Sequence, residues 1–300
     1  MTLSDVRPAP APAPPAKRSV VPWLLILGLF AVTAAYILVA VPRRAGPPGP
    51  ISRPMPTAPA DGLSDSYDGY TLAPVALPTG RGKGLPLAFR ILGPNGAPAA
   101  GYATVQTVPL HLYVVREDLS HYQHLHPRLD GDTWRVAVDV PDGGVYRMYA
   151  EFTPPERAGT RNPHLLSVRF IIAGDTSYVP VPPAQAAVDV GPFTVDRLDG
   201  AADLVAGRAT ALRFQIRDAR GKPVATLQPY LGAFAHVSAF DVLTQAMSHM
   251  HPIVAPNGGP PADGVLTFHT NWSSYGEQRL FLQFQVAGTL YLAVFTVVVV

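Results

Sequence analysis

One stretch of this chain occurs twice, and the repetition restricts the folds that the chain can adopt. A histidine followed thirteen residues later by His-x-His-Pro is found at His111, His124, His126 and Pro127, and again at His236, His249, His251 and Pro252. All four positions recur at an offset of 125 residues. Segments 87–91 and 212–216, which alternate apolar and polar residues, keep the same offset. A duplicated unit of this length is expected to be a domain with its own apolar core.

The register between the two copies shifts only where the sequence is typical of turns. Gly144, Arg147 and Phe152 recur 132 residues later, whereas Phe170 again recurs after 125. The extra residues fall in Pro-, Gly- and Arg-rich stretches, and the apolar alternation is kept. Each copy contains about seven short runs of strand character. In the first copy these runs lie at 85–92, 102–108, 110–116, 121–126, 133–140, 145–152 and 165–173.

Short runs at this spacing, without a long 3.6-residue apolar period after the N-terminal region, predict an all-β fold. We expect two tandem immunoglobulin-like antiparallel β-sandwich domains after one N-terminal transmembrane helix. A small closed barrel is the alternative for each copy. The predicted order is a Pro/Ala-rich tail (1–18), a transmembrane anchor (19–42), a Pro-rich stalk (43–79), the first sandwich (80–175), a linker (176–195) and the second sandwich (196–300).

The N-terminal region contains no charged residue between Arg18 and Arg43. An apolar helix of about 20 residues spans the ~30 Å hydrocarbon core of a bilayer. Trp23 lies near one end of the run, where interfacial aromatic residues are favoured. A cleaved signal peptide is the alternative, but its apolar region is normally only ~7–15 residues long. We expect a single-pass cell-membrane protein with its body outside the cytoplasm.

Composition and motifs exclude several kinds of site. The sequence has no cysteine, so it has no disulfide, thiolate zinc site or cysteine nucleophile. A formal net charge of +2 and scattered basic residues do not indicate a nucleic-acid partner. The sequence has no nucleophile elbow, phosphate-binding loop or His-Glu-x-x-His motif, and we expect no enzymatic activity.

The histidine spacing predicts a cluster on one face of a β-hairpin. Glu117-Asp-Leu-Ser120 is the polar turn between His111 and His126, and a hairpin centred on it places these two histidines opposite each other. His124 lies two residues from His126 and therefore on the same face. Opposed β-carbons are ~5 Å apart and diagonal ones up to ~8 Å, so three imidazoles converge. The second copy predicts the same arrangement about Leu243-Thr244.

Neutral imidazole is a common ligand of copper, zinc and nickel. The predicted metal ligands are His111, His124, His126, His236, His249 and His251, with the thioether of Met247 on the same face as the last two. Met250 falls on the opposite face and is predicted to belong to the core. Because the sequence has no thiolate and no carboxylate repeated with the histidines, a copper ion is preferred and zinc is the second choice.

A structural role for the histidines stays open. A His-x-His-Pro segment at a strand end can place hydrogen-bonding rings at the edge of a sandwich, where proline ends the ladder. His121, His164 and His269 have no counterpart in the other copy, and for them a surface or structural role is expected.

The second copy carries a resemblance to known proteins. Tyr230-Leu-Gly-Ala-Phe-Ala-His236, the following His249-Met-His251-Pro252 and the strand Arg279-Leu-Phe-Leu-Gln-Phe284 resemble a family of bacterial membrane-anchored or secreted proteins, often labelled heavy-metal-binding domain proteins. The resemblance spans about residues 80–300 and is looser in the first copy, which has Val105-Gln-Thr-Val in place of Tyr-Leu-Gly-Ala. It implies metal binding by the six repeated histidines.

Two functions are consistent with these patterns. The first is a membrane-tethered extracytoplasmic metal-binding protein, with copper held by a three-histidine cluster in each repeat. The second is a structural or protein-interaction module of the cell envelope, in which the histidines support the scaffold and an envelope protein is the partner. Bound metal distinguishes the two.

Overall fold

The computed structural model describes residues 61–160, 162–253 and 258–300. Within these ranges the chain forms strands β1 to β18 and one 3₁₀ turn, η1 (Pro155–Arg157), and it contains no α-helix. The predicted all-β class is therefore confirmed. No helix among the described residues has the length and apolar character needed to cross a membrane. The predicted tail (1–18) and anchor (19–42) lie outside the described residues.

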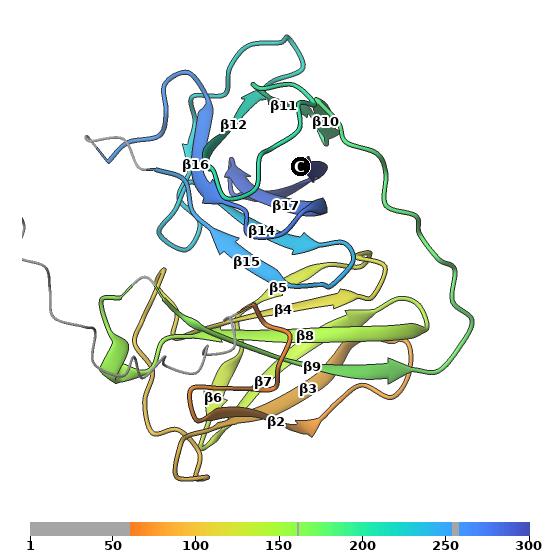
Figure 1. Cartoon of the computed structure of the whole chain (residues 1–300), viewed down its shortest axis with the longest axis vertical. Helices are drawn as coiled ribbons and strands as arrows, with labels where there is room; N and C mark the ends of the chain where they lie inside the picture. Colours follow the sequence, from red (N-terminus) through yellow and green to blue (C-terminus); the bar gives the residue numbers. More distant parts are fainter. Residues whose placement is uncertain (1–60, 161, 254–257) are drawn as a thin grey trace, which may run out of the picture. The chain divides into compact units, whose positions relative to one another are not determined.

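The first half of the described chain forms two antiparallel sheets that enclose an apolar core (Figure 1). One sheet has the order β1 (Ser66–Tyr67), β2 (Tyr70–Ala76), β3 (Gly82–Leu92), β7 (Thr133–Val140), β6 (Arg128–Asp130). The other has the order β5 (Gln123–Leu125), β4 (Leu110–Arg116), β8 (Gly144–Phe152), β9 (His164–Ile172). Phe89 and Trp134 from the first sheet meet Leu112 and Met148 from the second in this core.

Strand order identifies the type of sandwich. Lettered along the chain from β2, the strands follow the order A-B-E-D in one sheet and C′-C-F-G in the other. This is the arrangement of the immunoglobulin fold. Alternation of inward apolar and outward polar residues along β7 and β3 supplies the side chains that the two layers share.

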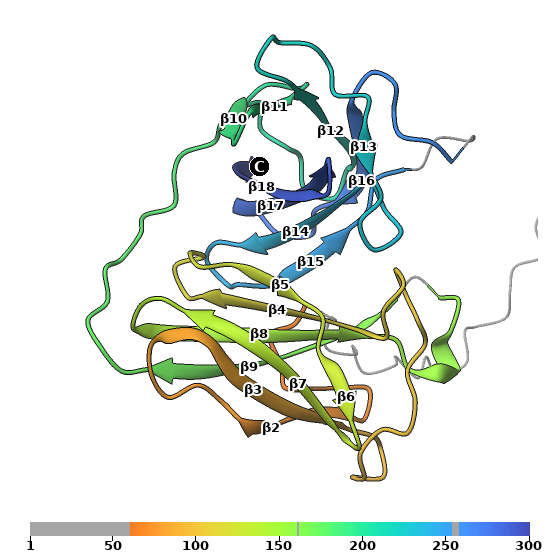
Figure 2. The ribbon, with the colours of Figure 1, turned by 180° about the vertical axis from the view of Figure 1, so that it is seen from behind.

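The second half repeats this arrangement (Figure 2). One sheet has the order β10 (Ala187–Val190), β11 (Phe193–Arg197), β12 (Ala209–Arg217), β16 (Val265–Asn271). The other contains β15 (Met247–Met250), β14 (Ala235–Asp241), β17 (Gly276–Val286) and β18 (Thr289–Val299), with β13 (Leu227–Gln228) paired to the end of β17. Its core is a separate apolar cluster that includes Phe214, Phe268 and Phe295.

Equivalent strands keep the offsets found in the sequence. Strand β14 begins 125 residues after β4, β17 begins 132 residues after β8, and β18 begins 125 residues after β9. The tandem arrangement of two like sandwiches is therefore present in the structure.

Strands also occur in segments for which we predicted none. Strands β1 and β2 lie in the predicted stalk (43–79), and β10 and β11 lie in the predicted linker (176–195). Pro74 obscures the strand pattern of β2, yet it is tolerated because β1 pairs only with Tyr70 and Thr71, so that Pro74 faces a free edge.

The predicted run at 102–108 is not a strand. The chain reverses there between Val105 and Val108, with positive φ at Gln106 and Thr107. Two successive positive φ angles are typical of a type I′ turn, which β-branched and apolar flanking residues do not reveal.

Candidate metal centre

The first three repeated histidines lie on the hairpin formed by β4 and β5. Leu112 pairs with Leu125 and Tyr113 pairs with His124, which is the predicted register. Ring centroids are 5.2 Å apart for His111 and His124, 5.3 Å for His111 and His126, and 4.9 Å for His124 and His126. We call His111, His124 and His126 triad 1.

The second copy builds the same cluster on β14 and β15. Ser238 pairs with His249 and Val237 with Met250, again in the predicted register. Ring centroids are 5.4 Å apart for His236 and His249, 4.9 Å for His236 and His251, and 4.4 Å for His249 and His251. We call His236, His249 and His251 triad 2. In each triad, one ring nitrogen per histidine lies within 4.8 Å of the other two.

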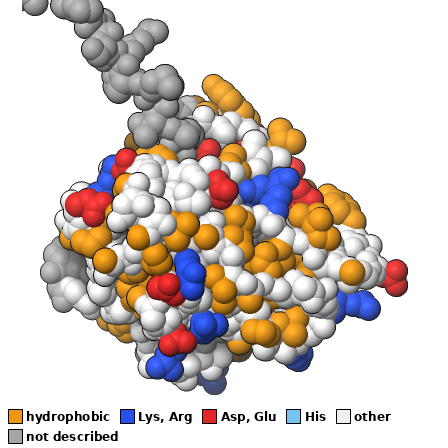
Figure 3. Space-filling model, turned by 90° about the horizontal axis from the view of Figure 1, so that it is seen from below, with side chains coloured by type: hydrophobic (Ala, Val, Ile, Leu, Met, Phe, Trp, Pro, Cys, Tyr) orange, Lys and Arg blue, Asp and Glu red, His pale blue; other side chains and the backbone are white. Residues whose placement is uncertain are grey.

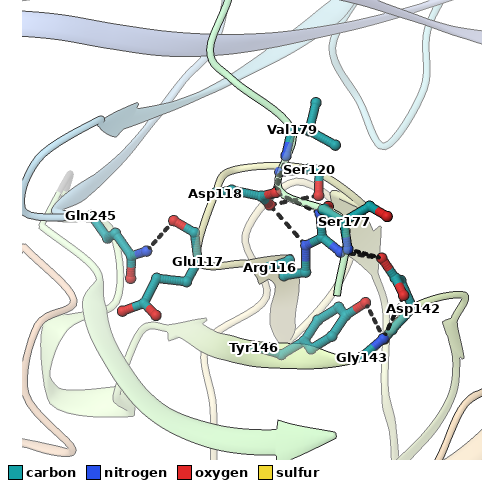
Figure 4. A network of polar contacts seen from close by, with 10 residues as sticks. All are labelled: Arg116, Glu117, Asp118, Ser120, Asp142, Gly143, Tyr146, Ser177, Val179 and Gln245. Carbon is teal, nitrogen blue, oxygen red and sulfur yellow. Dashed lines mark hydrogen bonds and ion pairs between the residues drawn. The ribbon is translucent and has the colours of Figure 1, made fainter. Parts of the chain in front are cut away.

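Buried charged residues hold the turns of both hairpins. Arg116, 2% exposed at the end of β4, donates to Asp118 at 2.5 and 2.9 Å, to Asp142 at 2.6 Å and to the carbonyl of Ser177 at 2.6 Å (Figure 4). The equivalent residue of β14 is Asp241, which accepts from the backbone and hydroxyl of Thr244. These contacts fix the turn, and the turn fixes which residues of the two strands face each other.

A type I′ turn precedes each leading histidine. Tyr230 and Ala233 bond across Leu231 and Gly232, both at positive φ, as Val105 and Val108 do in the first copy. The carbonyl of Tyr230 accepts from Nε2–H of His236 at 2.8 Å. The Tyr-Leu-Gly-Ala segment therefore has a geometric role, since it fixes the tautomer of this histidine.

Burial keeps the rings neutral. It lowers the pKa of His111 and His126 to about 4, and that of His236 and His251 to about 3. Burial also lowers the pKa of His124 well below its usual value. Figure 3 shows no histidine side chain on the face of the molecule that it presents. A neutral imidazole keeps one nitrogen lone pair, which is what a metal ligand requires.

Two side chains that the sequence analysis did not select bond to the central histidines. Nδ1–H of His249 donates to Glu151 Oε2 at 2.8 Å, and Nδ1–H of His124 donates to Gln283 Oε1 at 2.8 Å. Glu151 and Gln283 occupy equivalent positions, 132 residues apart, on β8 and β17. Each sandwich thus orients the central histidine of the other. The conserved offset was the signal that paired these positions, but their different chemistry hid them.

Glu151 is a carboxylate held in a largely closed environment. Its side chain is 12% exposed and also accepts from the Tyr113 hydroxyl at 2.7 Å. Burial opposes its ionisation, but the interaction with His249 and the hydrogen bonds from His249 and Tyr113 outweigh burial and lower the pKa of Glu151 to about 2. The absence of a partnered carboxylate was one reason to prefer copper over zinc, and that reason is wrong.

The two triads form one cluster of six rings. Ring centroids of opposite triads are 5.5 Å apart for His111 and His249, 5.5 Å for His124 and His249, and 5.8 Å for His124 and His236. We predicted two clusters from the hairpins and made no prediction of their adjacency, because a hairpin register says nothing about contacts between domains.

The ring geometry suits a metal ion. His236 donates through Nε2 and His249 donates through Nδ1, so the neutral rings direct the lone pairs of His236 Nδ1 and His249 Nε2 at each other over 3.3 Å. Metal–nitrogen bonds of ~2.0–2.1 Å at tetrahedral angles separate ligand nitrogens by about 3.3–3.4 Å. Nε2 of His126 and of His251 are buried without a hydrogen-bond partner among the described residues. Buried unpaired nitrogens are rare unless an ion or water occupies the site.

His111 lies close to a backbone group as His236 does. The backbone of Val105 is near enough to raise its pKa slightly, although Nε2 of His111 makes no hydrogen bond of standard geometry. Nδ1 of His111 lies 3.0 Å from Nε2 of His124.

The remaining sulfur and histidine predictions separate clearly. Met247 lies two residues before His249 and packs in an apolar cluster with Tyr113, Phe240 and Phe281, so its thioether remains a predicted ligand. Met250 packs against the second core, as predicted. His164 is buried between Tyr67 and Tyr70, and His269 is exposed; neither belongs to a triad.

Comparison with known proteins gives a family for the chain. A family model described as "Domain of unknown function (DUF8832)" matches residues 65–167 and 187–300. The chain belongs to this family. The matched ranges contain all six histidines of the two triads, Glu151 and Gln283. No curated protein matches the chain at a significant level.

Solved structures show only distant likeness. The Lin-41 filamin domain is 16% identical, with 40% of this chain and 98% of that chain covered and a TM-score of 0.25. The ICAM-5 D1–D4 ectodomain fragment is 16% identical, with 76% and 53% covered and a TM-score of 0.22. Domains 4 and 5 of the S-layer protein SbsC are 10% identical, with 77% and 97% covered and a TM-score of 0.24.

Proposed function

We propose that the chain binds transition-metal ions in the six-histidine cluster, with copper as the first choice and zinc as the second. The observation that carries the proposal is the pair His236 Nδ1 and His249 Nε2, whose lone pairs face each other at 3.3 Å. Two lone pairs repel in a buried site, and a cation between them removes the repulsion. The unpaired Nε2 atoms of His126 and His251 support the same assignment.

The residues divide into ligands and supporting groups. His111, His124 and His126 would hold one ion, and His236, His249 and His251 would hold another. Nitrogen-only ligand sets suit copper, zinc and nickel. The predicted Met247 thioether would favour Cu(I), whereas the carboxylate of Glu151 behind His249 is equally typical of zinc sites. The resemblance to heavy-metal-binding domain proteins supports metal binding without selecting the metal.

A structural role for the histidines is the second candidate, and the tandem immunoglobulin-like module itself supports it directly. The favouring observation is the close ion-pair geometry of His249 with Glu151. If His249 carries two protons, its second N–H donates to His236 Nδ1 and the facing lone pairs disappear. The cluster would then serve as a polar link between the two sandwiches.

Metal content and thermal unfolding distinguish the two candidates. We expect the full chain, purified without a histidine tag, to contain copper or zinc, and the metal-free protein to gain melting temperature when either ion is added. Changing His124 and His126 together to Asn should remove one bound ion. A melting temperature that ignores copper, zinc and nickel at neutral pH would leave the structural role as the answer.

The proposal includes a cellular place for the site. The uncharged run at 19–42 suggests a single-pass anchor with the sandwiches outside the cytoplasm, where an envelope protein is the natural partner. Protease added to intact cells should then remove the body and leave a short membrane-retained fragment. A soluble mature protein beginning near Val41 would instead identify the run as a signal peptide.

A further inference from the structure

Equivalent positions behind the two triads carry different chemistry. Glu151 accepts from His249 of triad 2, and Gln283 accepts from His124 of triad 1, each at 2.8 Å. The distances and donor atoms match, and both acceptors come from the opposite sandwich. One acceptor is a carboxylate and the other is a neutral amide. The two sites are therefore alike in ligands and different in the group that orients the central ligand.

We infer that the two triads differ in metal affinity, and that triad 2 fills first because Glu151 orients and polarises His249. This inference rests on the proposed metal binding. A carboxylate that accepts from the distal N–H of a ligating histidine makes the ring a better donor and fixes its direction. Its negative charge also attracts a cation in a closed site more strongly than an amide dipole does.

The surroundings of Glu151 show that the carboxylate is held in place for this contact. The Tyr113 hydroxyl donates to Glu151 Oε2 at 2.7 Å and lies 2.7 Å from His249 Nδ1, so the three groups form a closed set. The equivalent of Tyr113 in the second sandwich is Ser238, whose hydroxyl accepts from Tyr122 at 2.9 Å. Nothing comparable among the described residues braces Gln283. Glu151 is thus a positioning residue, and Tyr113 in turn fixes its carboxylate.

The test measures each triad separately with Cu(II) alone and with Zn(II) alone, against a chromophoric chelator of known affinity. His126→Asn in the full chain disables triad 1, and His251→Asn disables triad 2; the Nε2 atoms of both residues lack partners, so their loss costs the scaffold little. We expect the His126→Asn protein, which retains triad 2, to bind its ion about 10–100-fold more tightly than the His251→Asn protein.

Exchanging the orienting groups completes the test. Glu151→Gln added to His126→Asn should remove most of that difference. Gln283→Glu added to His251→Asn should strengthen binding, a gain that damaged folding cannot produce. Glu277→Gln, an exposed position on the same strand as Gln283, is the matched control and should change neither affinity.

The outcomes separate this inference from the proposed function. Equal affinities of the two triads, or a Glu151→Gln change without effect on triad 2, overturn the inference while metal binding stands. If the unaltered chain binds neither ion, the proposed function fails and the inference fails with it.

Discussion

At the scale of single residues, burial changes the pH range over which the histidines respond. An exposed histidine titrates near pH 6.5. The rings of His111, His126, His236 and His251 have their pKa lowered to about 3–4 by burial, so the folded protein takes up protons at these positions only in strong acid. Protons therefore compete with a metal ion at lower pH than they would in an exposed cluster.

The same shifts make the metal-free fold sensitive to acid. Because the pKa of each ring is lower in the folded state, the unfolded chain binds more protons between about pH 6.5 and 4, and stability falls as pH falls through that window. Above pH 6.5 the contribution is constant. We expect the melting temperature of the metal-free protein to drop steeply below pH 6.5 and His126→Asn to lessen the slope, as measured by thermal unfolding at each pH. His269→Asn, at an exposed position, should leave the slope unchanged; an equal effect would contradict this account.

The residues that orient the histidines could be predicted less well than the histidines themselves. A repeated His-x-His-Pro spacing and a two-residue strand period were enough to place three rings on one face, because both properties are local. Glu151 acts on His249 of the other sandwich, and the equivalent residue is Gln283. A search for repeated carboxylates misses such a pair, since only the position is repeated.

At the scale of elements, the two hairpins depend on buried charges at their turns. Arg116 ties the turn after β4 to Asp118, Asp142 and the carbonyl of Ser177. These bonds raise the pKa of the Arg116 guanidinium and hold the pKa of the Asp118 carboxyl well below its usual range. On the other side of the turn, Gln245 donates to the carbonyl of Glu117 at 2.7 Å, which connects the two hairpins (Figure 4).

Removing that buried cation should be costly. We expect Arg116→Met to destabilise the protein by roughly 3–5 kcal/mol, because two partly buried carboxylates lose their partner, which corresponds to a drop of roughly 10 °C in melting temperature. Arg135→Met is the matched control: its pair with Asp130 is 57% and 75% exposed, and such pairs contribute about 0–1 kcal/mol. Similar losses for both variants in thermal unfolding would show that the Arg116 network is not special.

Strand positions could be predicted well wherever the apolar alternation was uninterrupted. The runs 110–116 and 133–140 coincide with β4 and β7, and 145–152 and 165–173 each differ from β8 and β9 by one residue. The prediction was wrong at 102–108, where the chain turns at positive φ. It also missed β2 and β11, whose proline-rich surroundings resemble a linker and whose strand state comes from pairing with β3 and β12.

At the scale of the whole described chain, a third apolar cluster joins residues of both sandwiches. Tyr122 stacks on Phe281 with ring centroids 4.1 Å apart, and Tyr113, Phe240 and Met247 belong to the same cluster. The Tyr149 hydroxyl donates to the carbonyl of Gln245 at 2.7 Å. No sequence pattern of one domain announces such a surface, because its apolar residues look like ordinary core.

This surface should hold the halves together without the linker. We expect a chain cut at a protease site inserted between Pro183 and Ala184 to remain one particle in size-exclusion chromatography, since the apolar cluster and the crossed hydrogen bonds survive the cut. Tyr122→Ala should let the two fragments separate at lower urea concentration. Tyr178→Ala removes a ring that is 73% exposed and serves as the control. Separation of the unaltered fragments in buffer alone would mean that the linker, and not the surface, joins them.

The crossed bonds from Glu151 to His249 and from Gln283 to His124 also bear on ancestry. Contacts that are reciprocal between equivalent positions characterise an isologous interface, the kind found in two-fold dimers. A single-sandwich ancestor pairing with its own copy would have presented the same residue on both sides, so its two sites were necessarily identical. Only gene fusion allows the two positions to mutate independently. The Glu–Gln difference is then younger than the duplication and marks the point at which two equal sites began to specialise.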